Sequence, residues 1–269
     1  MSTVGEWRSN SPQLARLDCD VLLASALGCE RAAVIAHPER PLPSAVQRQL
    51  NDWRERRASG EPLAYILGYK EFWGLSLAVS EDVLIPRPET ELLVEEALAR
   101  VRSGHRVLEL GTGSGAIAIA IAAEQAHRDN TTVAATDVSA AALAVARRNG
   151  ALHSVNVHWQ VSDWFSAIEG SFDIIVSNPP YVAANDTHLE TLRDPMTALV
   201  PGPTGMEALT HIITNAPTHL RADGWLLLEH GHDQAAGVHE LLQQNGFAQI
   251  SSATDLAGHP RVSWGRILT

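Results

Sequence analysis

The sequence predicts an α/β protein in which a doubly wound, mostly parallel sheet follows a small helical domain. The first observation is the succession of a strand-like run, a glycine-rich loop and a helix over residues 106–122. The second is that polar side chains follow the ends of four successive strand-like runs, between residues 111 and 181. The third is that residues 1–72 show helical rather than alternating patterns. Ligands of open α/β sheets bind at the carboxyl ends of the parallel strands, so these polar positions are candidate site residues.

Residues 1–72 are expected to form a domain of short amphipathic helices, spanning 13–27, 30–36 and 44–59. Prolines and glycines separate these segments, as expected at helix ends. Residues 72–79 alternate like strands around Gly74, which predicts a β-hairpin, and we assign residues 73–85 to this linker. Residues 86–269 alternate strand and helix patterns and are expected to form the second domain.

The glycine loop Gly111-Thr112-Gly113-Ser114-Gly115 separates the strand-like run 106–110 from the helical run 116–122. Glycines permit positive φ angles and allow a ligand to approach the backbone closely. Gly111, Gly113 and Ala116 also fit the dinucleotide-binding fingerprint, so an NAD site remains an alternative for this loop alone. Glu109 and the third glycine favour S-adenosylmethionine. The candidate cofactor-binding residues here are Glu109, Gly111, Thr112, Gly113, Ser114 and Gly115.

The second strand, residues 132–137, ends in Asp137. A carboxylate at this place can accept hydrogen bonds from ribose hydroxyls. An NAD site asks for the same residue, so Asp137 indicates an adenosine-bearing cofactor without selecting which. The alternative is a helix cap for residues 139–149, for which Ser139 is the better candidate.

Asp163 and Trp164 follow the third strand, residues 157–161. An acid beside a flat aromatic ring can bind and stack an adenine. The alternative is a core tryptophan next to a solvated aspartate.

The fourth strand, residues 172–177, leads into Asn178-Pro179-Pro180-Tyr181. Two prolines fix two φ angles and make a rigid turn. The Asn178 side-chain oxygen and the Pro179 carbonyl can each accept one hydrogen from an NH2 group, while the Tyr181 ring packs against its plane. We therefore assign Asn178, Pro179 and Tyr181 as catalytic, and residues 178–181 as substrate-binding. The alternative is a Pro-Pro turn that only ends a strand.

Later segments complete a seven-stranded pattern. They are a helix at 205–221, a strand at 225–229, a helix at 233–245 and strands at 247–253 and 261–268. The family resemblance described below implies that the last strand is antiparallel, at one edge of the sheet.

These motifs together resemble a known family. Glu109–Gly115, Asp137, Asp163-Trp164 and Asn178–Tyr181 resemble the class I S-adenosylmethionine-dependent methyltransferases, which have a Rossmann-like fold. The narrower resemblance is to the bacterial peptide chain release factor glutamine methyltransferases. It rests on residues 61–68, 71–74, 84–91, 177–181 and 227–231. One departure is Arg193-Asp194-Pro195, where the family usually has Phe-Glu-Pro, so the acid is one methylene shorter.

The resemblance implies that the chain methylates the side-chain amide nitrogen of the glutamine in the Gly-Gly-Gln motif of release factors, which supports translation termination. The cofactor would be S-adenosyl-L-methionine, and the products N5-methylglutamine and S-adenosylhomocysteine. Residues 1–72 would then recognise the release factor, and residues 86–269 would catalyse the transfer.

The charge distribution bears on two alternatives. The net charge is −11, with 9 basic and 11 acidic side chains in residues 1–85 and 11 and 20 in the rest. This balance argues against a nucleic-acid amino methyltransferase, because binding long nucleic acid depends on many phosphate contacts. The second alternative is a non-catalytic module that binds S-adenosylmethionine. The intact Asn178–Tyr181 turn argues against that reading.

The remaining composition predicts a cytoplasmic enzyme. No apolar run approaches the ~20 residues of a membrane span, and residues 1–10 contain no apolar signal segment. Cys19 and Cys29 are the only cysteines and are expected to be free thiols. We expect no metal site, no membrane or nucleic-acid partner, and a monomer.

Overall fold

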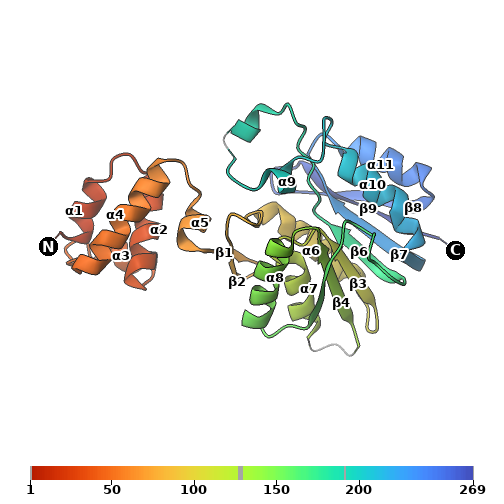
Figure 1. Ribbon diagram of the computed structural model, residues 1–269, viewed down its shortest axis with the longest axis horizontal. Coiled ribbons are helices and arrows are strands. Elements are labelled where there is room, and N and C mark those ends of the chain that lie inside the picture. Colours follow the sequence, from red (N-terminus) through yellow and green to blue (C-terminus); the bar gives the residue numbers. More distant parts are fainter. Residues whose placement is uncertain (1, 127–129, 191, 269) are drawn as a thin grey trace. The chain divides into compact units, whose positions relative to one another are not determined.

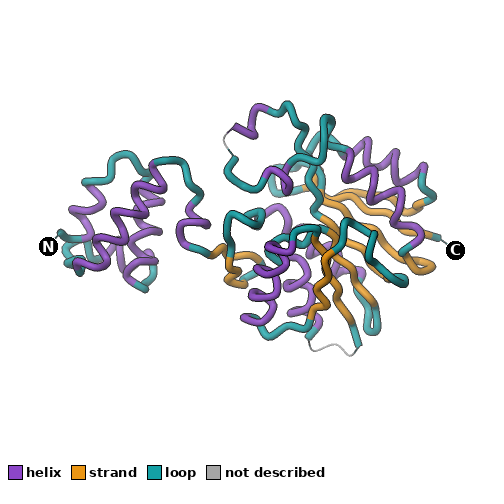
Figure 2. Tube along the Cα trace, in the orientation of Figure 1, coloured by secondary structure: helices purple, strands orange, loops and turns teal. Residues whose placement is uncertain are grey.

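The chain divides into two units between Tyr69 and Lys70, within the first strand. The computed structural model describes residues 2–126, 130–190 and 192–268. The first unit is helical and the second contains the large sheet, as the colouring by secondary structure shows (Figure 2). The predicted fold class, a mostly parallel seven-stranded sheet preceded by a helical domain and a hairpin, is confirmed.

The first unit contains the helices α1 (Val4–Ser9), α2 (Arg16–Leu27), α3 (Arg31–Ala36), α4 (Ser44–Ala58) and α5 (Leu63–Leu67) (Figure 1). Its core is built from apolar side chains of all five helices and the connecting loops, including the buried Trp7, Leu22, Leu42 and Leu50. The three predicted helices are confirmed with bounds shifted by at most three residues. The short helices α1 and α5 were not predicted, because five or six residues show too little of the 3.6-residue period.

Strands β1 (Tyr69–Phe72) and β2 (Leu75–Ala78) form the predicted hairpin. Its two central residues, Trp73 and Gly74, have φ angles of 52° and 68°. Positive φ at both positions is the signature of the tight two-residue turn that matches strand twist. The hairpin begins at Tyr69, three residues before residue 72, where the predicted alternation starts.

The second unit contains a sheet with the strand order β5-β4-β3-β6-β7-β9-β8. The strands are β3 (Arg106–Leu110), β4 (Thr132–Asp137), β5 (Val157–Val161), β6 (Phe172–Ser177), β7 (Leu220–Glu229), β8 (Phe247–Thr254) and β9 (Pro260–Ile267). Strand β9 is antiparallel to both of its neighbours, and the other pairs are parallel. The last strand is antiparallel as predicted, but it lies one place inside the edge, and β8 is outermost.

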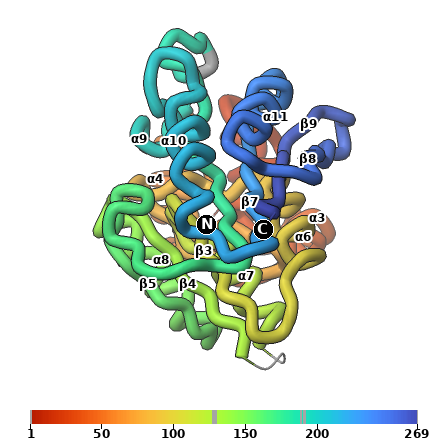
Figure 3. The backbone as a smooth tube through the Cα atoms, turned by 90° about the vertical axis from the view of Figure 1, so that its right-hand side faces the viewer, coloured from red at the N-terminus to blue at the C-terminus, as the bar shows by residue number. Residues whose placement is uncertain are grey.

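Helices cover both faces of this sheet. Helices α6 (Glu91–Arg100) and α7 (Ala116–Gln125) pack into one apolar core, and α8 (Ala140–Leu152) contacts β4 and β5. Helices α10 (Glu207–Asn215) and α11 (Ala235–Gln244) pack into the other core. Figure 3 shows α8 and β5 at one end of this unit and α11 with β8 and β9 at the other. Short helical turns at Pro88–Thr90 (η1), Thr187–Glu190 (η2), Met196–Leu199 (α9) and Ala216–Thr218 (η3) complete the chain.

Candidate functional site

The four predicted strand-end segments come together at one edge of the sheet. Parallel pairing places Leu110 of β3 opposite both Thr136 of β4 and Ser177 of β6. The segments that follow these strands line a cavity of about 220 Å³, which includes Gly111, Gly113, Asp137, Asp163, Trp164, Asn178 and Pro180. An adjoining cavity of about 50 Å³ is lined by Glu109, Thr112, Ser114 and again Gly111, Gly113 and Asn178. Asn178 therefore lies where the two cavities meet.

The glycine loop has the backbone geometry that the sequence indicates. Gly111, Gly113 and Gly115 all have positive φ, between 54° and 85°. A Cβ atom on Gly115 would lie 2.9 Å from Ile119 Cδ1 and 3.1 Å from a Trp159 ring carbon. Glycine is favoured there, because a φ of 85° is rarely adopted by other residues and a Cβ atom would crowd these side chains.

Glu109 is buried beneath this loop, with 1% of its surface exposed. Its Oε2 accepts hydrogen bonds from Thr112 Oγ1 at 2.6 Å and from the Ala118 backbone nitrogen at 2.9 Å. Burial raises the pKa of Glu109 to about 8, although these two hydrogen bonds oppose the rise. The carboxylate thus occupies the amino end of α7, where a dinucleotide would place its pyrophosphate. This arrangement favours a cationic cofactor over an anionic one.

Asp137 connects the end of β4 to the glycine loop. Its Oδ2 accepts from the Gly113 backbone nitrogen and its Oδ1 from the Ser139 backbone nitrogen, both at 2.9 Å. The hydroxyl of Ser139 accepts from Ala142 and caps α8, as expected for the better cap candidate. Each carboxylate oxygen of Asp137 still has a lone pair that can accept from a ligand hydroxyl.

Asp163 and Trp164 form another side of the larger cavity. Asp163 is exposed, whereas Trp164 is half-buried and packs against the apolar core under α10. The backbone of Trp164 has a φ angle of 46°. Its carbonyl accepts from the Ser162 hydroxyl at 2.8 Å, which holds the turn.

Only two of the four residues in the Asn178–Tyr181 turn line a cavity. Asn178 and Pro180 line the larger cavity, whereas Pro179 is buried and neither Pro179 nor Tyr181 is among the lining residues. Asn178 Nδ2 donates to the hydroxyl of Thr90 at 3.1 Å. Its side-chain oxygen is therefore the group left to face a ligand.

The Tyr181 hydroxyl points to a buried carboxylate. It donates to Glu229 Oε1 at 3.2 Å, and the Tyr181 carbonyl accepts from Gln234 Nε2 at 3.0 Å. Burial, and then the neighbouring Glu229, raise the pKa of the Tyr181 hydroxyl. Burial likewise raises the pKa of Glu229 to about 7, against the hydrogen bonds from Thr90 and Tyr181.

Several residues at the site carried no assigned role in the sequence. Thr90 and Glu229 lie in the stretches 84–91 and 227–231, which the family resemblance had marked without assigning roles.

Asp194 is another residue at the site to which the sequence assigned no role. It accepts from the Ile85 backbone nitrogen at 2.9 Å and pairs with Arg87 at 2.7 Å. The shortened acid thus holds the 84–90 segment to the loop before α9, and both segments line the cavities.

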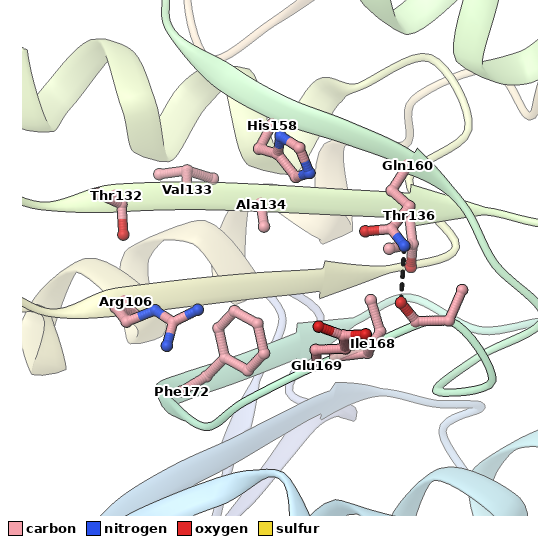
Figure 4. Close-up of a pocket in the computed structure, with 11 residues that line it drawn as sticks. Arg106, Thr132, Val133, Ala134, Thr136, His158, Gln160, Ile168, Glu169 and Phe172 are labelled. Carbon is pink, nitrogen blue, oxygen red and sulfur yellow. Dashed lines mark hydrogen bonds between the residues drawn. The ribbon is translucent and has the colours of Figure 1, made fainter.

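A larger cavity of about 500 Å³ lies elsewhere, on the face of β3, β4 and β5. A loop rather than a helix joins β5 to β6, and residues 167–169 of this loop line the cavity together with Phe172 (Figure 4). Gln160 Nε2 donates to the Ala167 carbonyl at 2.6 Å, and the Arg106 guanidinium lies 4.8 Å from the Phe172 ring centre. None of the predicted site residues lines this cavity.

No cluster of three potential metal-ligating side chains occurs among the described residues. His230 is engaged by the Gly231 carbonyl and the Ser263 hydroxyl. Within the described parts of the chain, no helix has the length and apolarity needed to cross a membrane.

Sequence profiles of two families match the chain. The profile of the methyltransferase small domain matches residues 88–198. The profile of the PrmC N-terminal domain matches residues 8–68.

Curated relatives match the chain over nearly its whole length. The release factor glutamine methyltransferase of Xylella fastidiosa is 46% identical over 261 residues, covering 94% of each chain. The enzyme of the same name from Pseudomonas aeruginosa is 47% identical over 258 residues, covering 94% of this chain and 92% of the relative.

Among solved structures, a methyltransferase from Pyrococcus furiosus aligns with a TM-score of 0.56 at 20% identity, covering 83% of this chain and 99% of that one. A 16S rRNA methyltransferase from T. thermophilus, solved with AdoMet and guanosine, aligns with a TM-score of 0.53 at 18% identity. The alignment covers 74% of this chain and 49% of that one. These likenesses show the class I methyltransferase fold.

Proposed function

The chain belongs to the family of release factor glutamine methyltransferases, and from this premise we propose that the joined cavities at the ends of β3, β4, β5 and β6 hold the cofactor and the substrate glutamine. The reaction is methylation of a glutamine side-chain amide in a peptide chain release factor. One observation carries the assignment of the site. Asn178 lines both cavities and anchors its amide nitrogen on Thr90, so its oxygen is left for a ligand.

The methyltransferase family to which the chain belongs implies that S-adenosylmethionine is the methyl donor. We assign Gly111, Gly113 and Asp137 to the adenosine side of the larger cavity, with Asp163 and Trp164 against the base. Glu109, Thr112 and Ser114 line the smaller cavity and would shape the methionine side. Gly115 lines neither cavity and would only set the path of the loop. When bound, the cofactor supplies an electrophilic methyl group, which is bonded to its positively charged sulfonium sulfur. The carboxylate of Asp137 suits that positive charge, and so does Glu109 once a nearby cation has displaced its proton.

The substrate amide nitrogen is a weak nucleophile because its lone pair is delocalised into the carbonyl. The site must therefore hold the NH2 in line with the methyl carbon, at about 3–3.5 Å. In the proposed geometry, one N–H of the glutamine donates to Asn178 Oδ1 and the other to the Pro179 carbonyl. These acceptors orient the nitrogen and stabilise the positive charge that grows on it during transfer. Tyr181, held by Glu229, does not line either cavity and would support the turn from behind, and Pro180 keeps the turn rigid.

The helical unit is proposed to recognise the body of the release factor, with the Gly-Gly-Gln loop entering the second unit. The match of residues 8–68 to a family-specific N-terminal domain supports this division. The acidic balance of the second unit suits a basic protein partner better than nucleic acid. We further propose that the protein acts in the cytosol as a monomer.

A direct assay tests this proposal. Purified protein is incubated with tritiated S-adenosylmethionine and, in parallel, with release factor, duplex DNA and ribosomal RNA. Label is expected only in release factor, and it should be lost when the glutamine of the Gly-Gly-Gln motif is replaced. Label in either nucleic acid, with none in release factor, would contradict the proposal.

A further inference from the structure

We propose that Thr90 and Glu229 are positioning residues that fix which way the Asn178 side-chain amide faces. The inference rests on the proposed role of Asn178 as the acceptor for the substrate amide. Neither residue lies next to Asn178 in the sequence, since Thr90 ends η1 and Glu229 ends β7. The fold brings both to the Asn178–Tyr181 turn.

Two hydrogen bonds are present around the turn, one from Asn178 to Thr90 and one from Tyr181 to Glu229. Thr90 and Glu229 are 4% and 1% exposed. Asn178 Nδ2 lies 3.1 Å from Thr90 Oγ1, and Glu229 Oε1 accepts from the Tyr181 hydroxyl. Glu229 Oε2 has no hydrogen-bond partner among the residues that the structure describes. The Thr90 hydroxyl is close enough to lower the pKa of the Glu229 carboxyl, as a donor to its charged form does.

The number of hydrogens on each side chain decides which groups donate and which accept hydrogen bonds here. A carboxylate only accepts hydrogen bonds, whereas a threonine hydroxyl has one hydrogen and two lone pairs. A buried carboxylate oxygen without a donor is unfavourable, so the single hydrogen of Thr90 is drawn towards Glu229. Thr90 can then only accept from Asn178. The nitrogen of the Asn178 amide must face Thr90, and the oxygen must face the cavity.

The reverse orientation would disable the site. An Asn178 side chain rotated by 180° would present its own NH2 to the NH2 of the substrate. Two donors would then oppose each other, and the nitrogen of the glutamine would lose one of its two acceptors. The carboxylate of Glu229 therefore sets the hydrogen-bonding polarity of a residue that it does not touch.

Protonation of Glu229 should undo this control. The charged and titratable groups that act on Glu229 are Arg261 of β9, Glu89 of η1 and Tyr181, and burial is the dominant effect. Protonated Glu229 can donate to Thr90, which releases the hydrogen of Thr90 towards Asn178. The amide is then free to reverse. Since the pKa of Glu229 is raised to about 7, the methyl-transfer rate should increase with pH through that region.

The first test compares Thr90→Val, Thr90→Ser and the control Thr132→Val. Thr132 is exposed at the start of β4, outside the site, so its replacement tests for a general effect of losing a hydroxyl in favour of a methyl group. Single-turnover rates on release factor with saturating cofactor should fall about tenfold or more for Thr90→Val, because the hydrogen bond that holds the amide is gone. Thr90→Ser should restore the rate to within about threefold of wild type. The dissociation constant of S-adenosylmethionine should stay within about threefold for all three variants.

The second test uses Glu229→Gln, which imitates the protonated carboxyl at nearly the same size. Its single-turnover rate should be low and independent of pH between 6 and 8.5, whereas the wild-type rate should rise through about pH 7. A wild-type-like rate for both Thr90→Val and Glu229→Gln would overturn the inference, and so would a wild-type pH profile in Glu229→Gln.

Asn178→Ala separates this inference from the proposed function. A slow Asn178→Ala with fast Thr90 and Glu229 variants would refute the positioning role alone. An Asn178→Ala variant as fast as wild type would refute the role of Asn178 on which both depend.

Discussion

At the scale of single residues, the buried carboxyl of Glu109 has a pKa far above its ordinary value. Burial raises its pKa from 4.5 to about 8. The folded protein therefore holds a proton on Glu109 at pH values where the unfolded chain does not. Because the folded pKa is the higher one, stability from this group is present at low pH and declines as pH rises between about 4.5 and 8.

We therefore predict that binding of S-adenosylmethionine releases protons near pH 7.5. A cationic ligand beside Glu109 favours its charged form and lowers its pKa. Calorimetric titrations in phosphate and in Tris should give different apparent enthalpies, in the direction of proton release. Glu109→Gln should remove that part of the difference, leaving any contribution from the amino group of the cofactor. Equal buffer dependence in wild type and variant would place the cofactor away from Glu109.

Asn178 offers a second prediction at the level of the residue. Asn178→Ala should reduce kcat on the order of 10²–10³-fold, as the loss of one preorganised active-site group does. Asn178→Asp keeps an acceptor but adds a negative charge beside the proposed sulfonium. That charge stabilises the cationic ground state more than the transition state, so the barrier rises.

The Asp variant should thus bind S-adenosylmethionine at least as tightly as wild type and transfer the methyl group much more slowly. Cofactor affinity by calorimetry and single-turnover rates at saturating cofactor would check the two halves. A near-normal rate for Asn178→Asp would mean that only the acceptor matters.

At the scale of elements, local pattern predicted the strands well and the contacts between distant segments poorly. The bounds of β3, β4, β5 and β6 agree with those expected, because each short strand-like run ends in a polar residue or is followed directly by glycine or serine. The predicted helix at 205–221 instead ends at Asn215, where Pro217 follows in a separate turn, and β7 begins earlier, at Leu220. Thr90 and Glu229 could not be placed at the site, since 88 and 48–51 residues of chain separate them from Asn178–Tyr181.

The ion pair between Arg87 and Asp194 is the clearest inter-element contact at the site. Its carboxylate also accepts from the Ile85 backbone, so it joins two walls of the cavity. We predict that Asp194→Asn weakens this junction and Asp194→Ala breaks it. Cofactor affinity should fall stepwise, by about tenfold or more for Ala, since a buried group that bonds a charged partner contributes roughly 1.5–3 kcal/mol.

Asp194→Glu provides the matched test, because it restores the acid length usual in the family. Calorimetry and thermal unfolding should be run together. A large loss of melting temperature without loss of cofactor affinity would show that the junction serves stability alone.

At the scale of the whole molecule, we propose that the two units have separate roles. Every described residue that lines the two strand-end cavities lies between Asp82 and Ala198, within the second unit. A protein beginning at Lys70 should therefore bind S-adenosylmethionine like the full chain. It should methylate intact release factor poorly, because remote contacts contribute to the positioning of the reacting group.

A short peptide containing Gly-Gly-Gln is the matched substrate for that experiment. It offers no remote contacts, so truncated and full-length proteins should methylate it at similar, low rates. Equal turnover of intact release factor by both proteins would remove the recognition role from the helical unit.

The backbone of Trp164 reveals a compromise within the cavity wall. Its φ angle of 46° lies in the left-handed region, where a residue other than glycine costs on the order of 1 kcal/mol or more. Glycine would relax this turn but would leave a gap where the indole now stands. The protein thus has an unfavourable backbone conformation at Trp164, together with a flat aromatic side chain after the end of β5. Under the proposed role of Trp164 against the adenine, the residue that is best for folding and the residue that is best for binding differ at this position.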